Sequence, residues 1–145
     1  MNLPFIHILH ADDDEEDRFI FRDGVREVGE DINLLQLNDG LAIINYLNSL
    51  KDPEAHPGVI VSDMKMPYKD GTEVLKIMRS HEEWHRIPIV ILSNSSTDHD
   101  RNLSLSLGAT AFFSKPGSYA EVARIVRQVM NICNNVRTRN RLKLN

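Results

Sequence analysis

The stretch FIHILHADD, residues 5–13, decides the fold, because an apolar run ends there in the carboxylates of Asp12 and Asp13. Three more apolar runs also end in a polar side chain: Asp63 after VIVS, Ser93 after IPIVIL and Lys115 after AFFS. Short apolar runs of this kind are typical of buried strands. The carboxyl ends of parallel strands lie at one edge of a sheet, so we expect these five side chains to gather there.

Apolar runs and amphipathic segments alternate about five times along the chain. Strands are expected, in chain order, over residues 5–11, 32–37, 58–62, 89–92 and 111–113. The expected helices carry these apolar faces, again in chain order: Phe21, Val25 and Val28; Ile43, Leu47 and Leu50; Val74, Leu75, Ile77 and Met78; Leu103 and Leu107; Val122, Ile125, Val129 and Ile132. Local signals limit the helices: Gly29 and Gly108 as ends, Asp70 as an N-cap, and SYAE at 118–121 as a capping box.

Strands that are apolar throughout are usually covered by helices on both faces. Five strand–helix units of this kind predict an α/β fold with a doubly wound, five-stranded parallel sheet. The chain has 145 residues, of which 41% are hydrophobic and 26% charged, and this suits a single domain with a sizeable core.

The sequence carries no signal for a membrane or for secretion. No apolar stretch approaches the ~20 residues that cross a bilayer. The N-terminal MNLPFIHILH lacks the cationic start and the cleavage site of a signal peptide. The single cysteine, Cys133, excludes an internal disulfide and suits a reducing compartment. We therefore expect a cytoplasmic protein that does not enter a membrane.

Charge is distributed unevenly along the chain. The net charge is −4, but residues 1–120 hold 11 basic and 20 acidic side chains, whereas residues 121–145 hold 6 basic and 1 acidic. An acidic body binds nucleic acid poorly, so only the basic end could attract polyanions. We expect residues 132–145 to form a basic tail that is a solvated or frayed helix end. Docking to an acidic partner or to a second copy of the chain is the alternative, and nucleic-acid binding is not expected.

Three carboxylates, a hydroxyl and an ammonium can together hold a divalent cation and a phosphoryl group. Carboxylates about 4 Å apart repel by about 4 kcal/mol at an effective dielectric constant of about 20, so Asp12, Asp13 and Asp63 need a cation nearby. Mg²⁺ is a hard ion that binds carboxylate oxygens and leaves positions for phosphate oxygens. Asp63 is the candidate nucleophile, because a carboxylate can form an acyl phosphate. Ser93 and Lys115 are the candidates for binding phosphoryl oxygens.

Each of these pieces has a simpler interpretation when it stands alone. The run DDDEED at 12–17 is typical of a solvated helix start, and an aspartate such as Asp63 can simply end a strand. A serine or a lysine at a strand end carries little information by itself. Their common position at strand ends, in this order, favours the phosphoryl site.

As a set, these motifs resemble the CheY-like family of response-regulator receiver domains, over roughly residues 5–131. The resemblance rests on the following residues: the acidic pair Asp12-Asp13, the motif DMKMP at 63–67 with Gly71 after it, Ser93, and the pair Lys115-Pro116. That family is itself an example of the flavodoxin-like strand order 2-1-3-4-5. The order is therefore implied by the resemblance and not by the spacing of the apolar runs.

The resemblance implies that Asp63 accepts a phosphoryl group from the phosphohistidine of a histidine kinase. Mg²⁺ would be bound by Asp13, Asp63 and the backbone carbonyl of Lys65, with Asp12 acting through water. The side chains of Lys65 and Ser95 occupy positions that tune the lifetime of the acyl phosphate. The sequence leaves open whether Lys65 shields the phosphoryl group or is solvated.

Ser93 and Phe112 would transmit phosphorylation to the surface. The resemblance implies that Ser93 moves toward the phosphoryl group and that Phe112, three residues before Lys115, turns into the vacated space. Phe112 stands where a tyrosine is common in the family, so any step that needs a hydroxyl is in question. The simpler interpretation is that Phe112 or Phe113 fills core.

The resemblance also implies the kind of signalling. The receiver domain would span residues 1–131 and would not be an enzyme, because its only reactions are its own phosphorylation and dephosphorylation. No effector domain follows, so we expect a stand-alone regulator that contacts an unknown downstream protein. The segment SHEEWHRIP at 80–88 resembles stand-alone regulators of phytochrome-type kinases, which tend to form homodimers. The alternative is a phosphorelay intermediate that passes its phosphoryl group to a histidine phosphotransfer protein.

One motif indicates a different function. His81 and His85 in HEEWH fit the pattern H-E-x-x-H of zinc peptidases. That motif needs one helix to present both histidines and a third ligand to complete the site, whereas here Pro88 follows within three residues. A zinc hydrolase is therefore a remote alternative, and we expect an exposed loop with Trp84 on the surface.

Overall fold

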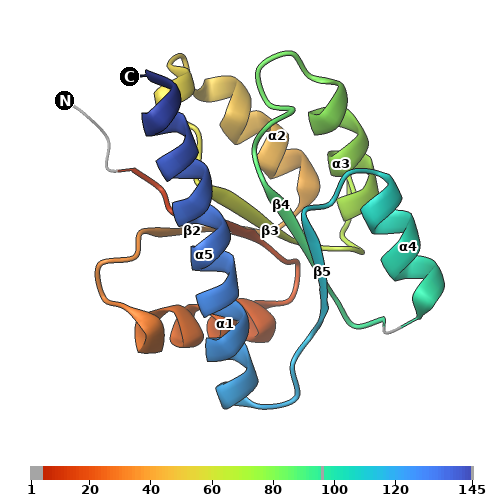
Figure 1. The fold of residues 1–145 in the computed structure, drawn as a ribbon. Helices are drawn as coiled ribbons and strands as arrows, with labels where there is room; N and C mark the ends of the chain where they lie inside the picture. Colours follow the sequence, from red (N-terminus) through yellow and green to blue (C-terminus); the bar gives the residue numbers. More distant parts are fainter. Residues whose placement is uncertain (1–4, 96, 145) are drawn as a thin grey trace.

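Five strands and five α-helices alternate along the chain and build a single sheet with helices on both faces (Figure 1). The computed structural model describes residues 5–95 and 97–144, with side chains as far as residue 136. The elements are β1 (Ile8–Ala11), α1 (Glu15–Val28), β2 (Leu34–Leu37), α2 (Gly40–Ser49), a short 3-10 helix (Pro53–Ala55), β3 (Val59–Asp63), α3 (Gly71–Ser80), β4 (Ile89–Ser93), α4 (Asp98–Ser106), β5 (Ala111–Ser114) and α5 (Tyr119–Leu144).

All neighbouring strands are parallel, and the order across the sheet is β2-β1-β3-β4-β5. The doubly wound, five-stranded α/β fold is thus confirmed, including the strand order implied by the family resemblance. The order reverses at β1, because β2 lies on one side of it and β3 on the other. In open sheets of this kind, ligands bind beyond the carboxyl ends of the strands at such a reversal.

Two apolar layers hold the helices to the sheet. Alternate side chains of β1 point to opposite faces, so Ile8 joins the cluster under α1 and α5 while Leu9 joins the cluster under α2 and α3. Figure 1 shows α1 and α5 together on one face and α2, α3 and α4 on the other. Burying one large aliphatic side chain contributes about 1.5–3 kcal/mol, so the two clusters are the main source of stability.

The first two predicted strands were too long at their amino ends, and the edge strands are less covered than predicted. The first strand begins at Ile8 rather than Phe5 and the second at Leu34 rather than Ile32, because ladder pairing starts at Ile8↔Leu34. Strands β1, β3 and β4 are buried throughout, but the edge strands β2 and β5 are mostly half-buried. An edge strand has a neighbour on one side only, which leaves part of its surface open.

Helix α4 turns only part of its predicted apolar face inward, since Leu107 at its end packs against the cluster under α2 and α3 but Leu103 does not. Leu103 was expected to face the core but is 36% exposed, and the residue that the helix buries is Ser104. The hydroxyl of Ser104 has no hydrogen-bond partner, a cost that an apolar residue would avoid. Thr97 caps the helix by accepting from the backbone N–H of Asp100.

Helix α5 is much longer than the other four. Half of the predicted capping box is present: Ser118 Oγ accepts from the N–H of Glu121, but the Glu121 carboxylate accepts from Gly117 and not from Ser118. The helix runs unbroken from Tyr119 to Leu144. The proposed division into a receiver domain, 1–131, and a tail, 132–145, stays a prediction, since the helix crosses that boundary and Cys133 is buried.

Helices α1 and α5 pack closely because Gly24 has no side chain. A Cβ atom placed on Gly24 would collide with Val122 of α5. Among the described residues, no helix is both long enough and apolar enough to cross a membrane.

Candidate functional site

The first two site carboxylates follow β1 directly. The register Ala11↔Ser62 places Asp12 beside Asp63, the last residue of β3. Asp12 is 1% exposed, and its N–H donates to the Leu37 carbonyl at 3.1 Å. The next aspartate, Asp14, caps α1 by accepting from the N–H groups of Glu16 and Asp17. The acidic run therefore divides into residues that face the sheet edge and a residue that starts the helix.

Three of these carboxylates form a compact cluster. One oxygen each from Asp12, Asp13 and Asp63 lie within 4.8 Å of one another. Opposite ligands of Mg²⁺ are about 4.2 Å apart when each bond is about 2.1 Å, so the cluster is close to the span of one ion. Carboxylate oxygens are also the ligands that this hard cation prefers. The residues present fit a magnesium ion.

Lys115 brings a positive charge into the same cluster. It follows β5, and its ammonium Nζ lies 2.8 Å from Asp12 Oδ2, 2.8 Å from Asp17 Oδ2 and 3.1 Å from Asp63 Oδ2. The ammonium has three N–H donors, so three carboxylates saturate it. Two of these partners, Asp12 and Asp63, are nearly buried, and the lysine side chain itself is 10% exposed.

The pKa values of Asp12 and Lys115 are set by burial and by neighbouring charges together. Burial raises the pKa of Asp12, against the hydrogen bonds from Lys115 and from the Asp14 N–H, which lower it. Burial by itself would lower the pKa of Lys115, but the hydrogen bonds and charges of Asp12, Asp17 and Asp63 outweigh it and raise that pKa above its ordinary value. Lys115 is therefore charged at any physiological pH.

A buried histidine lies in β1 next to this cluster. His10 stacks on Phe21, with ring centres 4.0 Å apart, and its Nδ1 lies 3.0 Å from Gln36 Nε2. Gln36 Nε2 also donates to the Arg18 carbonyl, so Nδ1 of His10 acts as an acceptor. Burial, helped by the charges of Lys115 and Arg18, lowers the pKa of His10 to about 3. His10 is neutral in the folded protein.

A cleft of about 240 Å³ opens above the carboxylates. Its lining includes all the predicted site residues except Asp12 and Phe112, namely Asp13, Asp63, Lys65, Ser93, Ser95 and Lys115, together with their neighbours Asp14, Asp17 and Asn94. Within it, Ser93 Oγ accepts from the N–H of Ser95 at 3.1 Å and donates weakly to Met64 Sδ at 3.9 Å. Lys65 is exposed, and the use of its backbone carbonyl as a metal ligand stays a prediction.

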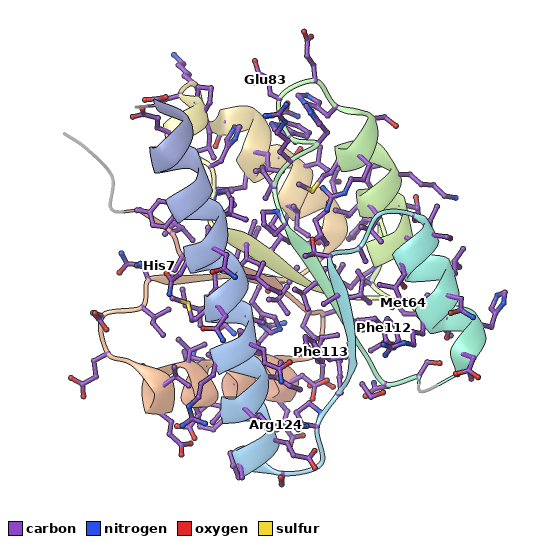
Figure 2. All side chains as sticks on the ribbon, viewed as in Figure 1. His7, Met64, Glu83, Phe112, Phe113 and Arg124 are labelled. Atoms are coloured by element: carbon purple, nitrogen blue, oxygen red, sulfur yellow. The ribbon has the colours of Figure 1, made fainter. Side chains whose placement is uncertain are left out.

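The two adjacent phenylalanines of β5 lie on opposite sides of the sheet (Figure 2). Phe112 is buried in the cluster under α2 and α3, directly opposite Ile91 of the neighbouring strand β4. Phe113 packs partly buried against the cluster under α1 and α5. Phe112 thus fills core in this structure, and its role as a switch stays a prediction.

Comparison with known proteins agrees with this geometry. Residues 8–127 match the family described as the response regulator receiver domain. The chain belongs to this family. It is a receiver domain of a two-component response regulator, a class that is phosphorylated on aspartate and is generally counted as a signalling domain rather than an enzyme.

Several receiver proteins are similar over most of their length. The response regulator Rcp1 of Synechocystis sp. is 27% identical over 124 residues, which are 84% of each chain. The crystal structure of its Mn²⁺-bound form matches with a TM-score of 0.73 over 87% of this chain and 91% of the other. The phosphorylated cyanobacterial phytochrome response regulator RcpA matches with a TM-score of 0.75 at 25% identity, over the same shares. Receivers bind Mg²⁺ at an aspartate cluster of the kind found here.

Asp17 is a member of the receiver site that the sequence pattern missed. It lies four residues before Phe21, on the same helix face as Phe21 and Val25, which are buried. A carboxylate at the head of a buried helix face is a signal that could have found it. The pattern treated Asp17 only as part of an acidic run.

The zinc-peptidase pattern is not assembled in this receiver. Helix α3 ends at Ser80, and His81 is its C-cap, so no helix presents both histidines. Trp84, expected on the surface, is 3% exposed and belongs to the core, where it stacks on His81 at 3.6 Å. Residues 81–85 precede β4, so they lie at the amino end of the strands, and Figure 2 shows Glu83 far from Met64 at the other end. Among the described side chains, the aspartate cluster is the one place where three or more carboxylate, histidine or cysteine ligand atoms come together.

Proposed function

We propose that Asp63 is the residue that accepts the phosphoryl group, in a reaction that depends on Mg²⁺. The observation that carries the proposal is the position of Asp63, at the end of β3, with a side chain only 9% exposed that lines the cleft between Asp13 and Lys115. The aspartates that line this cleft repel anions, so the negative charge of a phosphoryl donor must be offset by cations in the cleft. Lys115 is one of them.

The transfer follows from the groups present. A carboxylate oxygen of Asp63 forms a bond to the phosphorus of a phosphohistidine, and the phosphorus–nitrogen bond breaks. The electron pair of that bond stays on the imidazole nitrogen, which takes a proton from solvent. Asp12 and Asp13, with Asp63 and the carbonyl of Lys65, would hold the magnesium ion, which supplies charge neutralisation for the phosphoryl oxygens.

Ser93, Lys65 and Ser95 lie where their side chains could contact the phosphoryl group or the water that attacks it. Ser93 ends β4 beside the cleft, and its hydroxyl is free to exchange the weak Met64 contact for a phosphoryl oxygen. A shift of Ser93 toward the cleft would open space next to Phe112. Lys65 and Ser95 line the cleft, where each can help or hinder the water that hydrolyses the acyl phosphate.

The donor is proposed to be a histidine kinase of the phytochrome type. The support is the similarity to Rcp1 and to the phytochrome response regulator RcpA, of which this chain covers most. We propose that the protein acts in the cytoplasm as a stand-alone regulator and signals by contact with another protein. Mixing the labelled protein with a histidine phosphotransfer domain separates this proposal from a relay, because a relay predicts rapid transfer of the label.

Labelling with acetyl phosphate and Mg²⁺ tests the acceptor. The wild-type protein should gain one phosphoryl group that is stable in acid and labile in base, as expected of an acyl phosphate. Asp63→Asn should gain none, since an amide oxygen is a poor nucleophile. Equal labelling of the two proteins would refute the assignment of Asp63.

A further inference from the structure

The ammonium of Lys115 is shared between two kinds of carboxylate. Asp12 and Asp63 belong to the metal-binding cluster, whereas Asp17 does not. Asp17 nevertheless approaches as closely as Asp12 does, with Oδ2 at 2.8 Å from Nζ. It reaches the ammonium from the first turn of α1, 98 residues away in the chain.

Asp17 differs from an ordinary acidic residue at a helix start. Acidic side chains in the first turn usually point to solvent and interact with the helix dipole. Glu16 does this and is exposed. Asp17 instead lies on the face that carries Phe21 and Val25, and two-thirds of its side chain is covered. Its orientation is set by the sheet edge and by Lys115.

We propose that Asp17 is a positioning residue that draws Lys115 away from the phosphoryl site. A bound magnesium ion offsets the charges of Asp12 and Asp63 but leaves the charge of Asp17 in place, because Asp17 is outside the cluster. The ammonium is then attracted more strongly to Asp17 than to its other two partners. Asp17 thus leaves the cluster oxygens available to the metal and competes with the phosphoryl group for the ammonium.

The proposal predicts two effects of opposite sign. In Asp17→Asn, the ammonium pairs more fully with Asp12 and Asp63, so Mg²⁺ binds about 3- to 5-fold more weakly, as expected for a partly exposed ion pair. Beryllofluoride binds an aspartate oxygen with the shape of a phosphoryl group. At saturating Mg²⁺ it should bind about 3- to 5-fold more tightly, because Lys115 no longer has to leave Asp17.

Two controls separate contact with Lys115 from charge alone. Glu16→Gln removes the same charge from the same helix turn without touching Lys115, and we expect both affinities to stay within about 1.5-fold. Asp17→Glu keeps the charge and should restore wild-type affinities. Asp17→Ser provides a second neutral side chain and should behave as Asp17→Asn does.

The deciding experiment is a double-mutant cycle with Lys115→Ala. Mg²⁺ affinity is measured by calorimetry and beryllofluoride affinity by ¹⁹F NMR, each on the full chain. If Asp17 acts through Lys115, then Asp17→Asn in the Lys115→Ala background has no more effect than Glu16→Gln. An undiminished effect in that background would overturn the inference. The inference rests on the proposed function, and failure of the wild-type protein to bind beryllofluoride would refute that function instead.

Discussion

Two segments of this chain are rich in metal-binding side chains, and the fold uses them in opposite ways. The run DDDEED at 12–17 follows β1 and supplies carboxylates to the sheet edge where Asp63 and Lys115 also arrive. The segment HEEWH at 81–85 precedes β4 and lies at the other end of the strands. Its local pattern is complete, but among the described residues no group of three possible ligand atoms forms around it.

The difference shows that the function of a motif depends on where the fold places its side chains. The aspartates come from strands far apart in sequence, and each one alone is uninformative. They form a site because parallel strands all deliver their carboxyl ends to one edge. The two histidines are only four residues apart in sequence, but His81 ends its helix and Trp84 of the same segment packs into the core. The following predictions test this contrast between a metal site and a packing segment.

The packing role of segment 81–85 predicts the largest change in stability. Trp84→Ala should lower the free energy of unfolding by about 3–5 kcal/mol, because it leaves a cavity among buried side chains. Denaturant unfolding monitored by circular dichroism measures the change. Glu83→Ala, at the exposed neighbouring position, is the matched control and should change it by less than about 0.5 kcal/mol. A small effect of Trp84→Ala would place Trp84 back on the surface.

The metal-binding role of the aspartates predicts the next largest effect. Asp13→Asn should weaken Mg²⁺ binding by about 10- to 100-fold, because it removes an anionic ligand from the cluster. The double variant His81→Asn, His85→Asn should bind Mg²⁺ as the wild type does. Calorimetry with Mg²⁺ and then with Zn²⁺ measures both. Stoichiometric zinc bound to the wild type and lost in the histidine variant would reverse the contrast.

The buried histidine beside the aspartates predicts a smaller dependence of stability on pH. Unfolded His10 takes up a proton near pH 6.5, whereas the folded protein keeps it neutral down to about pH 3. Because the unfolded chain binds more protons in this window, the free energy of unfolding falls as pH falls. From pH 6.5 to pH 5 the loss due to His10 is about 1.5 kcal/mol.

Comparison with His10→Leu isolates that contribution. Denaturant unfolding of both proteins without metal, from pH 7 to pH 5, should show a shallower decline in the variant. The raised pKa of Asp12 affects the stability of both proteins, so its contribution cancels when their two pH dependences are compared. Parallel declines would mean that His10 is protonated in the folded state.

Most of the fold could be predicted because its signals are periodic and repeated. Five apolar runs separated by amphipathic segments identify the sheet and its helices, and the polar residues that end four of these runs indicate the site. Leu103 was placed wrongly because α4 is short and carries few apolar residues. Its face is therefore decided by packing against β5, which buries Ser104 instead.

Trp84 and Asp17 were missed for a related reason. A loop before a central strand can fold back over the core, and nothing in the letters HEEWH tells which side chain is covered. The role of Asp17 could be found only from the position of Lys115 in three dimensions, because the two residues are 98 positions apart in the chain. Periodicity predicts which face of an element is buried, but it does not predict which distant residue meets that face.

The length of α5 extends the receiver beyond its packed core. Val122, Val126, Val129 and Cys133 are buried, so this part of the helix is held against α1 and the sheet. From Cys133 to Leu144 the helix continues for about 17 Å, at about 1.5 Å per residue. A tilt of about 5° about Cys133 would displace the far end by about 1.4 Å along that length. A small change in the packing of α5 would therefore be enlarged at its far end.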